Sequence, residues 1–241
     1  MEQPYLSVVI PAYNESAHIV STLEKISKYL AERKTPYEIL VVDDGSSDDT
    51  ATVVKALADS NSAIRLIRND GNQGKGSAVK RGVINSWGEM VYFTDADLST
   101  PIEEIEKFFP QFPHHDVVIG SRSIAGAEVR VHEPFYREIL GKLFNKFVRV
   151  LCVGGFVDTQ CGAKMFRKDP AQMIFPLIQT SRFSFDVEVL LVARRLGYKI
   201  KELPIRWFYS ANTSVRMLED GPRMLWDLFR IRWIHRNLKA R

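Results

Sequence analysis

Short apolar runs alternate with longer amphipathic segments over the first hundred residues. The first run, 6–10, is rich in β-branched residues and ends at a proline, which is typical of a buried strand. Similar runs occupy 38–42, 64–67 and 90–94, and helical patterns lie between them at about 15–32, after Ser46 and at about 77–87. Because strand and helix alternate, the pattern predicts an α/β fold with a mostly parallel sheet and helices on both faces.

The chain is long enough for one such domain and a C-terminal appendage. It has 241 residues, of which 45% are hydrophobic and 26% charged. We expect a domain at 1–210 and a separate helical segment at 211–241. The nearest candidate for a membrane-spanning helix, 144–157, is interrupted by Lys146 and Arg149, so we expect no such helix.

The start of the chain and its cysteines favour a cytoplasmic location. Met1 leads almost directly into the first strand, without a basic region and cleavage site. Cys152 and Cys161 are the two cysteines, and we expect them to be free thiols in a reducing compartment.

The net charge of +4 is unevenly distributed. Residues 191–241 carry twelve Lys and Arg against four Asp and Glu, whereas the rest of the chain is slightly acidic. A basic tail attracts nucleic acid or anionic lipid, although a solvated helix face is the simpler interpretation.

A basic amphipathic helix is predicted from about residue 221 to 241. One apolar stripe consists of Met224, Leu228, Ile231, Ile234 and Leu238, and a second consists of Leu225, Trp226, Phe229 and Trp233. One stripe can pack against the domain while the other contacts a membrane surface, where Trp and Arg are favoured. Burial of the second stripe against a partner subunit is the alternative.

Polar residues follow three of the predicted strands. Residues 13–15 come after the first strand, Asp43 and Asp44 after the second, and Asp95 and Asp97 after the fourth. Ligands of parallel α/β sheets bind at the carboxyl ends of the strands, so we expect these side chains to form a site.

The sequence Asp95-Ala96-Asp97 predicts a metal site. In an extended chain residues two apart point the same way, and two carboxylates suit Mg²⁺ or Mn²⁺ with the remaining ligands from a diphosphate. A polar turn that caps a helix near Pro101 is the alternative. Asp43 and Asp44 favour the functional interpretation, because two acidic pairs at adjacent strand ends repel each other unless a cation or hydrogen-bond donors separate them.

Gly74-Lys75-Gly76 offers backbone and one ammonium group to phosphates. It matches neither the ATPase loop nor the dinucleotide fingerprint, and a tight turn into a helix explains it equally well.

Five motifs occur in the order and spacing of glycosyltransferase family 2. They are Pro11-Ala12-Tyr13-Asn14-Glu15, Val42-Asp43-Asp44-Gly45-Ser46, Asn72-Gln73-Gly74-Lys75-Gly76, Asp95-Ala96-Asp97 and Gly120-Ser121-Arg122. The segments 158–167 and 183–188 match further. Over about 5–235 the chain resembles the dolichyl-phosphate glucose and mannose synthases of this family, and 97–101 and 159–162 are more similar to the glucosyl branch.

The resemblance implies a Rossmann-like GT-A fold and an inverting, single-displacement transfer from a nucleotide sugar, UDP-glucose being favoured. It assigns the donor site to Pro11, Tyr13, Glu15, Asp43, Asp44, Lys75, Asp95, Ala96 and Asp97. Asp95 and Asp97 would hold Mg²⁺ or Mn²⁺ with the diphosphate.

The implied acceptor is a polyprenyl phosphate, which is already largely dianionic near neutral pH and needs no general base. Arginines grip phosphate through a planar fork, and Arg122, Arg130 and Arg137 are the predicted acceptor-phosphate residues. The predicted catalytic set is Asp95, Asp97, Arg122 and Arg137. Asp186 and Glu188 are expected to orient arginines.

Three alternatives remain open. A hydroxyl acceptor would require a carboxylate base, for which Asp186 and Glu188 are candidates. GDP-mannose is the alternative donor. A nucleic-acid-binding protein fits the basic tail, but an acidic cleft repels phosphate unless metal is present, so we expect no nucleic acid. We expect a peripheral enzyme on the cytoplasmic face of a membrane, with a separate anchor protein as a further candidate partner.

Overall fold

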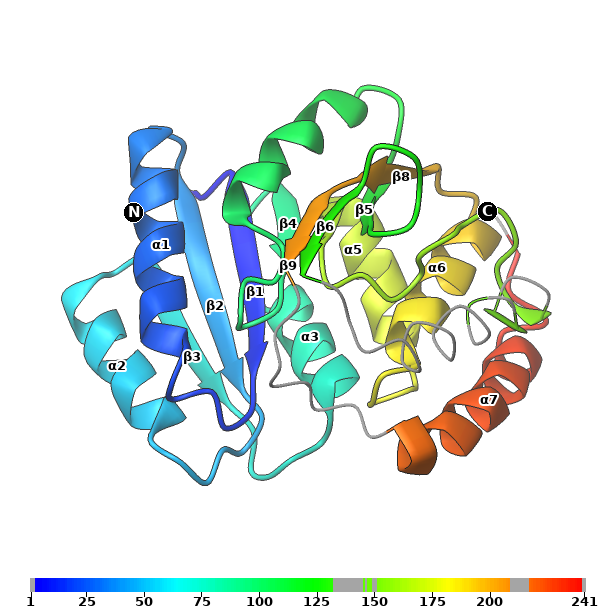
Figure 1. The fold of residues 1–241 in the computed structure, drawn as a ribbon, viewed down its shortest axis with the longest axis horizontal. Helices are drawn as coiled ribbons and strands as arrows, with labels where there is room; N and C mark the ends of the chain where they lie inside the picture. The colour runs from blue at the N-terminus through cyan, green and yellow to red at the C-terminus, as the bar shows by residue number, and fades with distance from the viewer. Residues whose placement is uncertain (1–2, 132–144, 146, 149–150, 209–216, 240–241) are drawn as a thin grey trace.

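The structure is a computed structural model that describes residues 3–131, 145, 147–148, 151–208 and 217–239 (Figure 1). Within these residues, one sheet has the strand order β3-β2-β1-β4-β7-β5-β8, and β6 pairs with β9 in a small second sheet. The strands are β1 (Leu6–Ala12), β2 (Tyr37–Asp43), β3 (Ile64–Arg68), β4 (Met90–Phe93), β5 (Val117–Ser121), β6 (Glu128–Val131), β7 (Lys164–Arg167), β8 (Ile200–Pro204) and β9 (Arg206–Phe208). The helices are α1 (Ile19–Glu32), α2 (Thr50–Ser60), α3 (Lys75–Ile84), α5 (Lys168–Ile174), α6 (Phe185–Arg195) and α7 (Met217–Ile234), with 3₁₀ helices η1 (Ile102–Lys107), η2 (Phe109–Gln111) and η3 (Phe175–Leu177).

The first four strands form a parallel block. β1 lies between β2 and β4, and β3 pairs with β2 on the outside. Every residue of β1 is buried, as expected for a parallel strand covered on both faces. The predicted α/β fold with a mostly parallel sheet is therefore confirmed.

Helices cover both faces of the sheet. Alternate residues of β1 enter two different cores: Val8 and Ile10 pack with α1 and η1, whereas Val9 packs with α3 and α6. Figure 1 shows α1 and α2 on one side of the parallel block and α3 on the other. This arrangement leaves the loops after the strands free to build a site.

The second half of the sheet contains an antiparallel strand that the hydrophobic pattern does not predict. β7 runs antiparallel between β4 and β5, and β8 then pairs parallel with β5. β7 begins with Lys164, whose side chain is fully buried beside Asp186. Because β7 has a lysine at its start and an arginine at its end, its sequence lacks the apolar pattern that predicts a strand.

The C-terminal helix α7 packs one face on α6 and exposes another. Leu228 and Ile231 are fully buried in the core that α6 shares, and Leu225 packs against the same core although its predicted place is the outer stripe. The aromatic residues of that stripe are exposed: Trp226 by 69%, Phe229 by 54% and Trp233 by 65%. Among the described helices, none has both the length and the apolar character that crossing a bilayer requires.

Candidate active site

The loops after β1, β2 and β4 are joined to one another at one edge of the sheet. The Asp44 amide donates to the Ala12 carbonyl at 2.8 Å, and the Thr94 amide donates to the Val9 carbonyl at 3.0 Å. The Glu15 amide donates to Thr50 Oγ1 at 2.8 Å, which ties the loop after β1 to the start of α2. Because residues 13–18 form this connection, α1 starts at Ile19 and not at the predicted Glu15.

Asp44 organises the glycine-rich loop. Its Oδ1 accepts hydrogen bonds from Asn69 Nδ2 at 2.6 Å and the Gln73 amide at 3.1 Å, and its Oδ2 accepts one from the Gly74 amide at 2.7 Å. The side chain is buried. Asp44 thus holds the backbone that leads into Lys75, and its predicted contact with a nucleoside stays a prediction.

The other predicted nucleoside residues lie around the same edge. Asp43 is fully buried, accepts a hydrogen bond from the Ser46 amide at 3.0 Å and lies 3.1 Å from Arg68 Nε. Pro11 is a buried residue of β1, whereas Tyr13 is 42% exposed. Tyr13 therefore offers an accessible ring, which is suitable for contact with a flat base.

Asp95 and Lys75 form an ion pair at the centre of this edge. Lys75 is the first residue of α3, and its Nζ lies 2.5 Å from Asp95 Oδ1. Burial opposes ionisation of Asp95, but Lys75, with Lys164 and Arg122 nearby, holds the pKa of Asp95 below its ordinary value. Burial likewise opposes the charge of Lys75, and Asp95 keeps the pKa of Lys75 above its ordinary value. Both groups are therefore charged at neutral pH.

Gly162 makes the position of Asp95 possible. A Cβ atom at Gly162 would lie 2.0 Å from Asp95 Oδ2, a distance that no side chain can accept. Gly162 belongs to the segment that resembles the family, yet sequence analysis gives it no role. The signal that could reveal it is the presence of a glycine in the motif 158–167, which also carries Asp158 and Lys164.

Asp97 lies in a turn and not in the extended chain that its spacing suggests. The Leu98 amide donates to the Asp95 carbonyl at 3.2 Å, and Leu98 has φ of 48°. Asp97 accepts hydrogen bonds from the Ser99 amide at 2.9 Å and Ser99 Oγ at 2.8 Å. Ala96 is buried and its carbonyl accepts a hydrogen bond from Thr22 Oγ1 at 2.7 Å, which fixes the turn.

The carboxylates of this edge suit a divalent cation. Burial, followed by repulsion from Asp97 and Asp95, raises the pKa of Glu15 to about 7, so negative charge is in excess here. Asp95 Oδ1 is buried and, apart from its ion pair, makes no hydrogen bond in the described structure. Among the described residues no three acidic, His or Cys side chains are arranged to hold a metal alone. The carboxylates of Asp95 and Asp97 fit Mg²⁺ or Mn²⁺ that takes other ligands from a diphosphate and water.

Arg122 is held at the end of β5 by a buried carboxylate. Its Nε and Nη2 lie 2.7 Å and 3.0 Å from the two Asp158 oxygens, and its backbone amide also donates to Asp158. Its guanidinium carbon is 5.2 Å from the centre of the Trp207 ring. This bidentate pairing fixes the plane of the guanidinium. Asp158 and Trp207 belong to the candidate site but were missed by sequence reasoning, because neither is near Arg122 in the chain.

The structure describes less of the other two predicted acceptor arginines, Arg130 and Arg137. Arg130 is part of β6, which pairs with β9 beside Trp207. Arg137 lies outside the described residues. Their roles toward phosphate stay predictions.

Asp186 and Glu188 contact groups other than the expected arginines. Asp186 Oδ1 lies 2.5 Å from Lys164 Nζ, and both side chains are buried. Glu188 is fully buried and bonds to His235 and to the segment before α6. The physical reason is position: both carboxylates lie in the first turn of α6, which faces the core.

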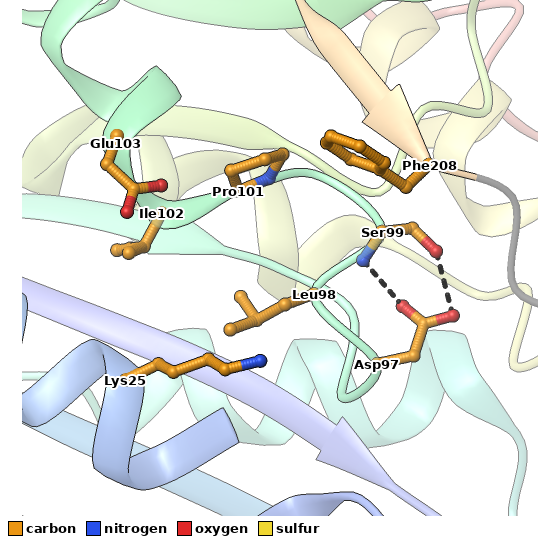
Figure 2. Close-up of a pocket in the computed structure, with 8 residues that line it drawn as sticks. All are labelled: Lys25, Asp97, Leu98, Ser99, Pro101, Ile102, Glu103 and Phe208. Atoms are coloured by element: carbon orange, nitrogen blue, oxygen red, sulfur yellow. Dashed lines mark hydrogen bonds between the residues drawn. The ribbon is translucent and has the colours of Figure 1, made fainter. Parts of the chain in front are cut away.

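A hollow of about 540 Å³ opens beside the Asp97 turn (Figure 2). Its lining consists of Lys25, Asp97, Leu98, Ser99, Pro101, Ile102, Glu103 and Phe208. Figure 2 shows Asp97 bonded to Ser99 on one side of this hollow and Lys25 reaching toward Leu98 from α1. The turn that carries Asp97 therefore borders open space.

A fold and an acidic site of this kind are typical of sugar-transferring enzymes. The family model described as glycosyl transferase family 2 matches residues 7–175, and the chain belongs to this family. Among similar curated proteins is a dolichyl-phosphate beta-glucosyltransferase from Dictyostelium discoideum, 37% identical over 95% of this chain and 74% of the relative. Proteins of the same name from Saccharomyces cerevisiae and Homo sapiens are 31% and 33% identical, over 96% and 84% of this chain and 75% and 67% of theirs. The chain is therefore a glycosyltransferase.

Solved structures share the fold. The glucosyl-3-phosphoglycerate synthase from Mycobacterium tuberculosis, in complex with Mn²⁺, UDP and glucosyl-3-phosphoglycerate, has a TM-score of 0.68 at 20% identity and covers 95% of this chain and 78% of its own. A mannosyltransferase from Pyrobaculum calidifontis, in complex with GDP-Man and Mn²⁺, has a TM-score of 0.62 over 100% of this chain and 67% of its own, also at 20% identity. These similarities confirm the predicted GT-A fold.

Proposed function

We propose that this enzyme transfers glucose, with inversion, from UDP-glucose to a polyprenyl phosphate of the dolichyl type. The named relatives act on dolichyl phosphate and match nearly the whole chain. The observation that carries the proposal is that an acidic group and a cationic group lie at the same end of the parallel strands. The acidic turn with Asp95 and Asp97 suits the donor, and Arg122, fixed by a buried carboxylate, suits an anionic acceptor.

The proposed donor half of the site combines the carboxylates of Asp95 and Asp97 with the ammonium group of Lys75. Asp95 and Asp97 would hold Mg²⁺ or Mn²⁺, which when bound neutralises charge on the leaving diphosphate. Lys75 lies against Asp95 and offers an ammonium group to the same diphosphate. Asp44 fixes the backbone before Lys75, and Tyr13 is exposed for the uracil ring.

The acceptor half needs no general base. A phosphate monoester has a second pKa of about 6, so its oxygen is already a nucleophile near neutral pH. Arg122 can hold that phosphate while Asp158 fixes its orientation. We propose Arg130 and Arg137 as further acceptor-phosphate residues.

Two observations disfavour a hydroxyl acceptor. The candidate bases Asp186 and Glu188 are both buried, with exposures of 4% and 0%. Each also has a protein partner: Asp186 pairs with Lys164, and Glu188 accepts a hydrogen bond from Thr180. A general base must reach the proton it abstracts, so these two carboxylates are poorly placed for that task.

We also propose a membrane contact through residues 211–241. The exposed Trp226, Phe229 and Trp233 share one face of α7, and Arg236 lies 4.4 Å from the Trp233 ring centre. Aromatic side chains bordered by arginine are favoured at lipid headgroups. We further propose that the enzyme acts peripherally on the cytoplasmic face, with a separate anchor protein as an additional partner.

Replacing Arg122 by lysine tests the acceptor class. Lysine keeps the charge but loses the bidentate pairing, so we expect kcat/KM for polyprenyl phosphate to fall about 10- to 100-fold, as the loss of a charge-assisted hydrogen bond predicts. Affinity for UDP with Mn²⁺ should be unchanged. Steady-state kinetics with varied lipid phosphate and calorimetry with UDP give the two quantities.

Arg65→Lys is the matched control. Arg65 also pairs with a buried carboxylate, Glu38, at 2.5 Å and stacks on an indole ring, that of Trp87, at the opposite end of the strands. Its substitution should leave both quantities unchanged. An Arg122→Lys enzyme that saturates with lipid phosphate like the wild type would remove Arg122 from the acceptor site.

A further inference from the structure

Glu188 is a buried carboxylate that collects donors from the segment before α6. Its Oε2 accepts hydrogen bonds from the Thr180 amide at 2.7 Å and Thr180 Oγ1 at 2.5 Å. The Gln179 amide lies 3.0 Å from its Oε1. His235 Nε2, just beyond α7, lies 2.7 Å from the same Oε1. A carboxylate with this many partners fixes the backbone of residues 179–180.

The segment that Glu188 fixes packs directly on the first turn of α3. The Ser77 amide donates to the Ser181 carbonyl at 3.1 Å, and in the next turn Lys80 Nζ donates to the Ile178 carbonyl at 2.8 Å. Gly74 has φ of 102°, and a Cβ there would lie 2.4 Å from the Ser181 carbonyl oxygen. The position of residues 178–181 therefore sets the position of this turn.

The first turn of α3 carries Lys75. Lys75 extends from it to Asp95, and the Gly74 amide donates to Asp44 Oδ2. A shift of the turn would move the ammonium group away from the diphosphate site. Displacement of a binding group by about 1 Å can cost as much as 100-fold in rate.

We propose that Glu188 is a positioning residue for the donor site, acting through Thr180 and Ser181 on the first turn of α3 and so on Lys75. This inference rests on the proposed function. Glu188 is fully buried and does not touch the ligand itself. His235, which also bonds to Glu188, joins the end of α7 to this contact.

A thermodynamic cycle between Glu188 and Lys75 tests the proposal. The variants are Glu188→Gln, Lys75→Met and the double variant, and the measured quantity is the Kd for UDP in the presence of Mn²⁺ by calorimetry. Glutamine keeps the size of the side chain but places an N–H donor among donors. We expect about a tenfold weaker Kd for Glu188→Gln, a comparable or larger loss for Lys75→Met, and no further loss in the double variant.

Glu38→Gln is the matched control. Glu38 is a buried glutamate that accepts hydrogen bonds from Ser7 Oγ and the Trp87 amide at 2.6 Å each, remote from α3's first turn. It should lower the melting temperature without changing the Kd. Thr180→Val, which removes only the hydroxyl bond to Glu188, should give a smaller loss of affinity in the same direction if Glu188→Gln fails to fold.

Two outcomes would overturn the inference. Wild-type affinity in Glu188→Gln, or in Thr180→Val where that variant replaces it, would show that the carboxylate does not position the donor site. Losses that multiply in the double variant would show that Glu188 acts independently of Lys75. If the wild-type protein bound no UDP with Mn²⁺, the proposed function itself would fail, which is a different result from either.

Discussion

At the scale of single residues, Asp95 and Arg122 are each fixed by a partner that is distant in the chain. Asp95 is held against Lys75 and is enclosed by Gly162, while Arg122 is held by Asp158. These contacts orient the groups before any ligand binds. Pre-orientation matters in catalysis because the cost of arranging the groups is met during folding.

Gly162→Ala should damage the donor site with little effect on the fold. The added Cβ would lie 2.0 Å from Asp95 Oδ2, so the carboxylate must move away from Lys75. We expect glucose transfer to fall about 100-fold, the size of effect expected when a reacting arrangement shifts by about 1 Å. Enzyme assays and a melting curve measure the two effects.

Gly221→Ala serves as the control, since a Cβ at Gly221 meets no atom within 4 Å. It should retain the transfer rate in detergent. Retention of full activity by Gly162→Ala would contradict the placement of Asp95 in the donor site.

The residue types of the site could be predicted from sequence, but their surroundings could not. Asp95, Lys75 and Arg122 stand in recognisable motifs. Asp158, which orients Arg122, is 36 residues away from it and follows no periodic pattern. The spacing of Asp95 and Asp97 suggested extended chain, and the turn depends on Leu98 at φ of 48°, a conformation that its side chain does not reveal.

At the scale of elements, α7 divides its apolar residues between the core and the surface. Leu228 and Ile231 are fully buried, whereas Trp226, Phe229 and Trp233 are exposed. Helical periodicity predicted both stripes, but it could not assign Leu225, which lies at their border and packs inward. The antiparallel β7 was not predicted, because its buried Lys164 requires Asp186 from another element.

Substitution of Trp226, Phe229 and Trp233 by serine should release the enzyme from lipid. These side chains are exposed, so the free energy of unfolding should change by only about 0.5 kcal/mol per site. Each buried aromatic contributes about 1.5–3 kcal/mol to transfer out of water, so partitioning onto vesicles should fall at least tenfold. Vesicle co-sedimentation measures this partitioning.

Trp87→Ser is the control for that variant, because Trp87 is 49% exposed but lies beside Arg65, away from α7. It should bind vesicles like the wild type. Unchanged vesicle binding by the α7 variant would remove this helix from the proposed membrane contact.

At the scale of the whole molecule, the sheet brings both halves of the proposed site to one edge. The parallel order β2-β1-β4 collects the loops with Asp44, Glu15 and Asp95, and β5, two strands beyond β4, presents Arg122. The strands β1 to β4 were predictable because they are continuous apolar runs between helices, whereas β5 was not predicted. The pairing of distant loops depends on tertiary contacts, which one sequence does not display.

Transfer of radiolabelled sugar to a short polyprenyl phosphate tests both the donor and the acceptor that we propose. UDP-glucose and GDP-mannose would be compared with Mg²⁺ or Mn²⁺ present, beside an Asp97→Asn variant that preserves the size of a side chain bonded to Ser99. We predict metal-dependent labelling of the lipid from UDP-glucose, abolished in the variant. Labelling from GDP-mannose alone would contradict the sugar assignment, and metal-dependent UDP binding without labelled lipid would contradict the acceptor.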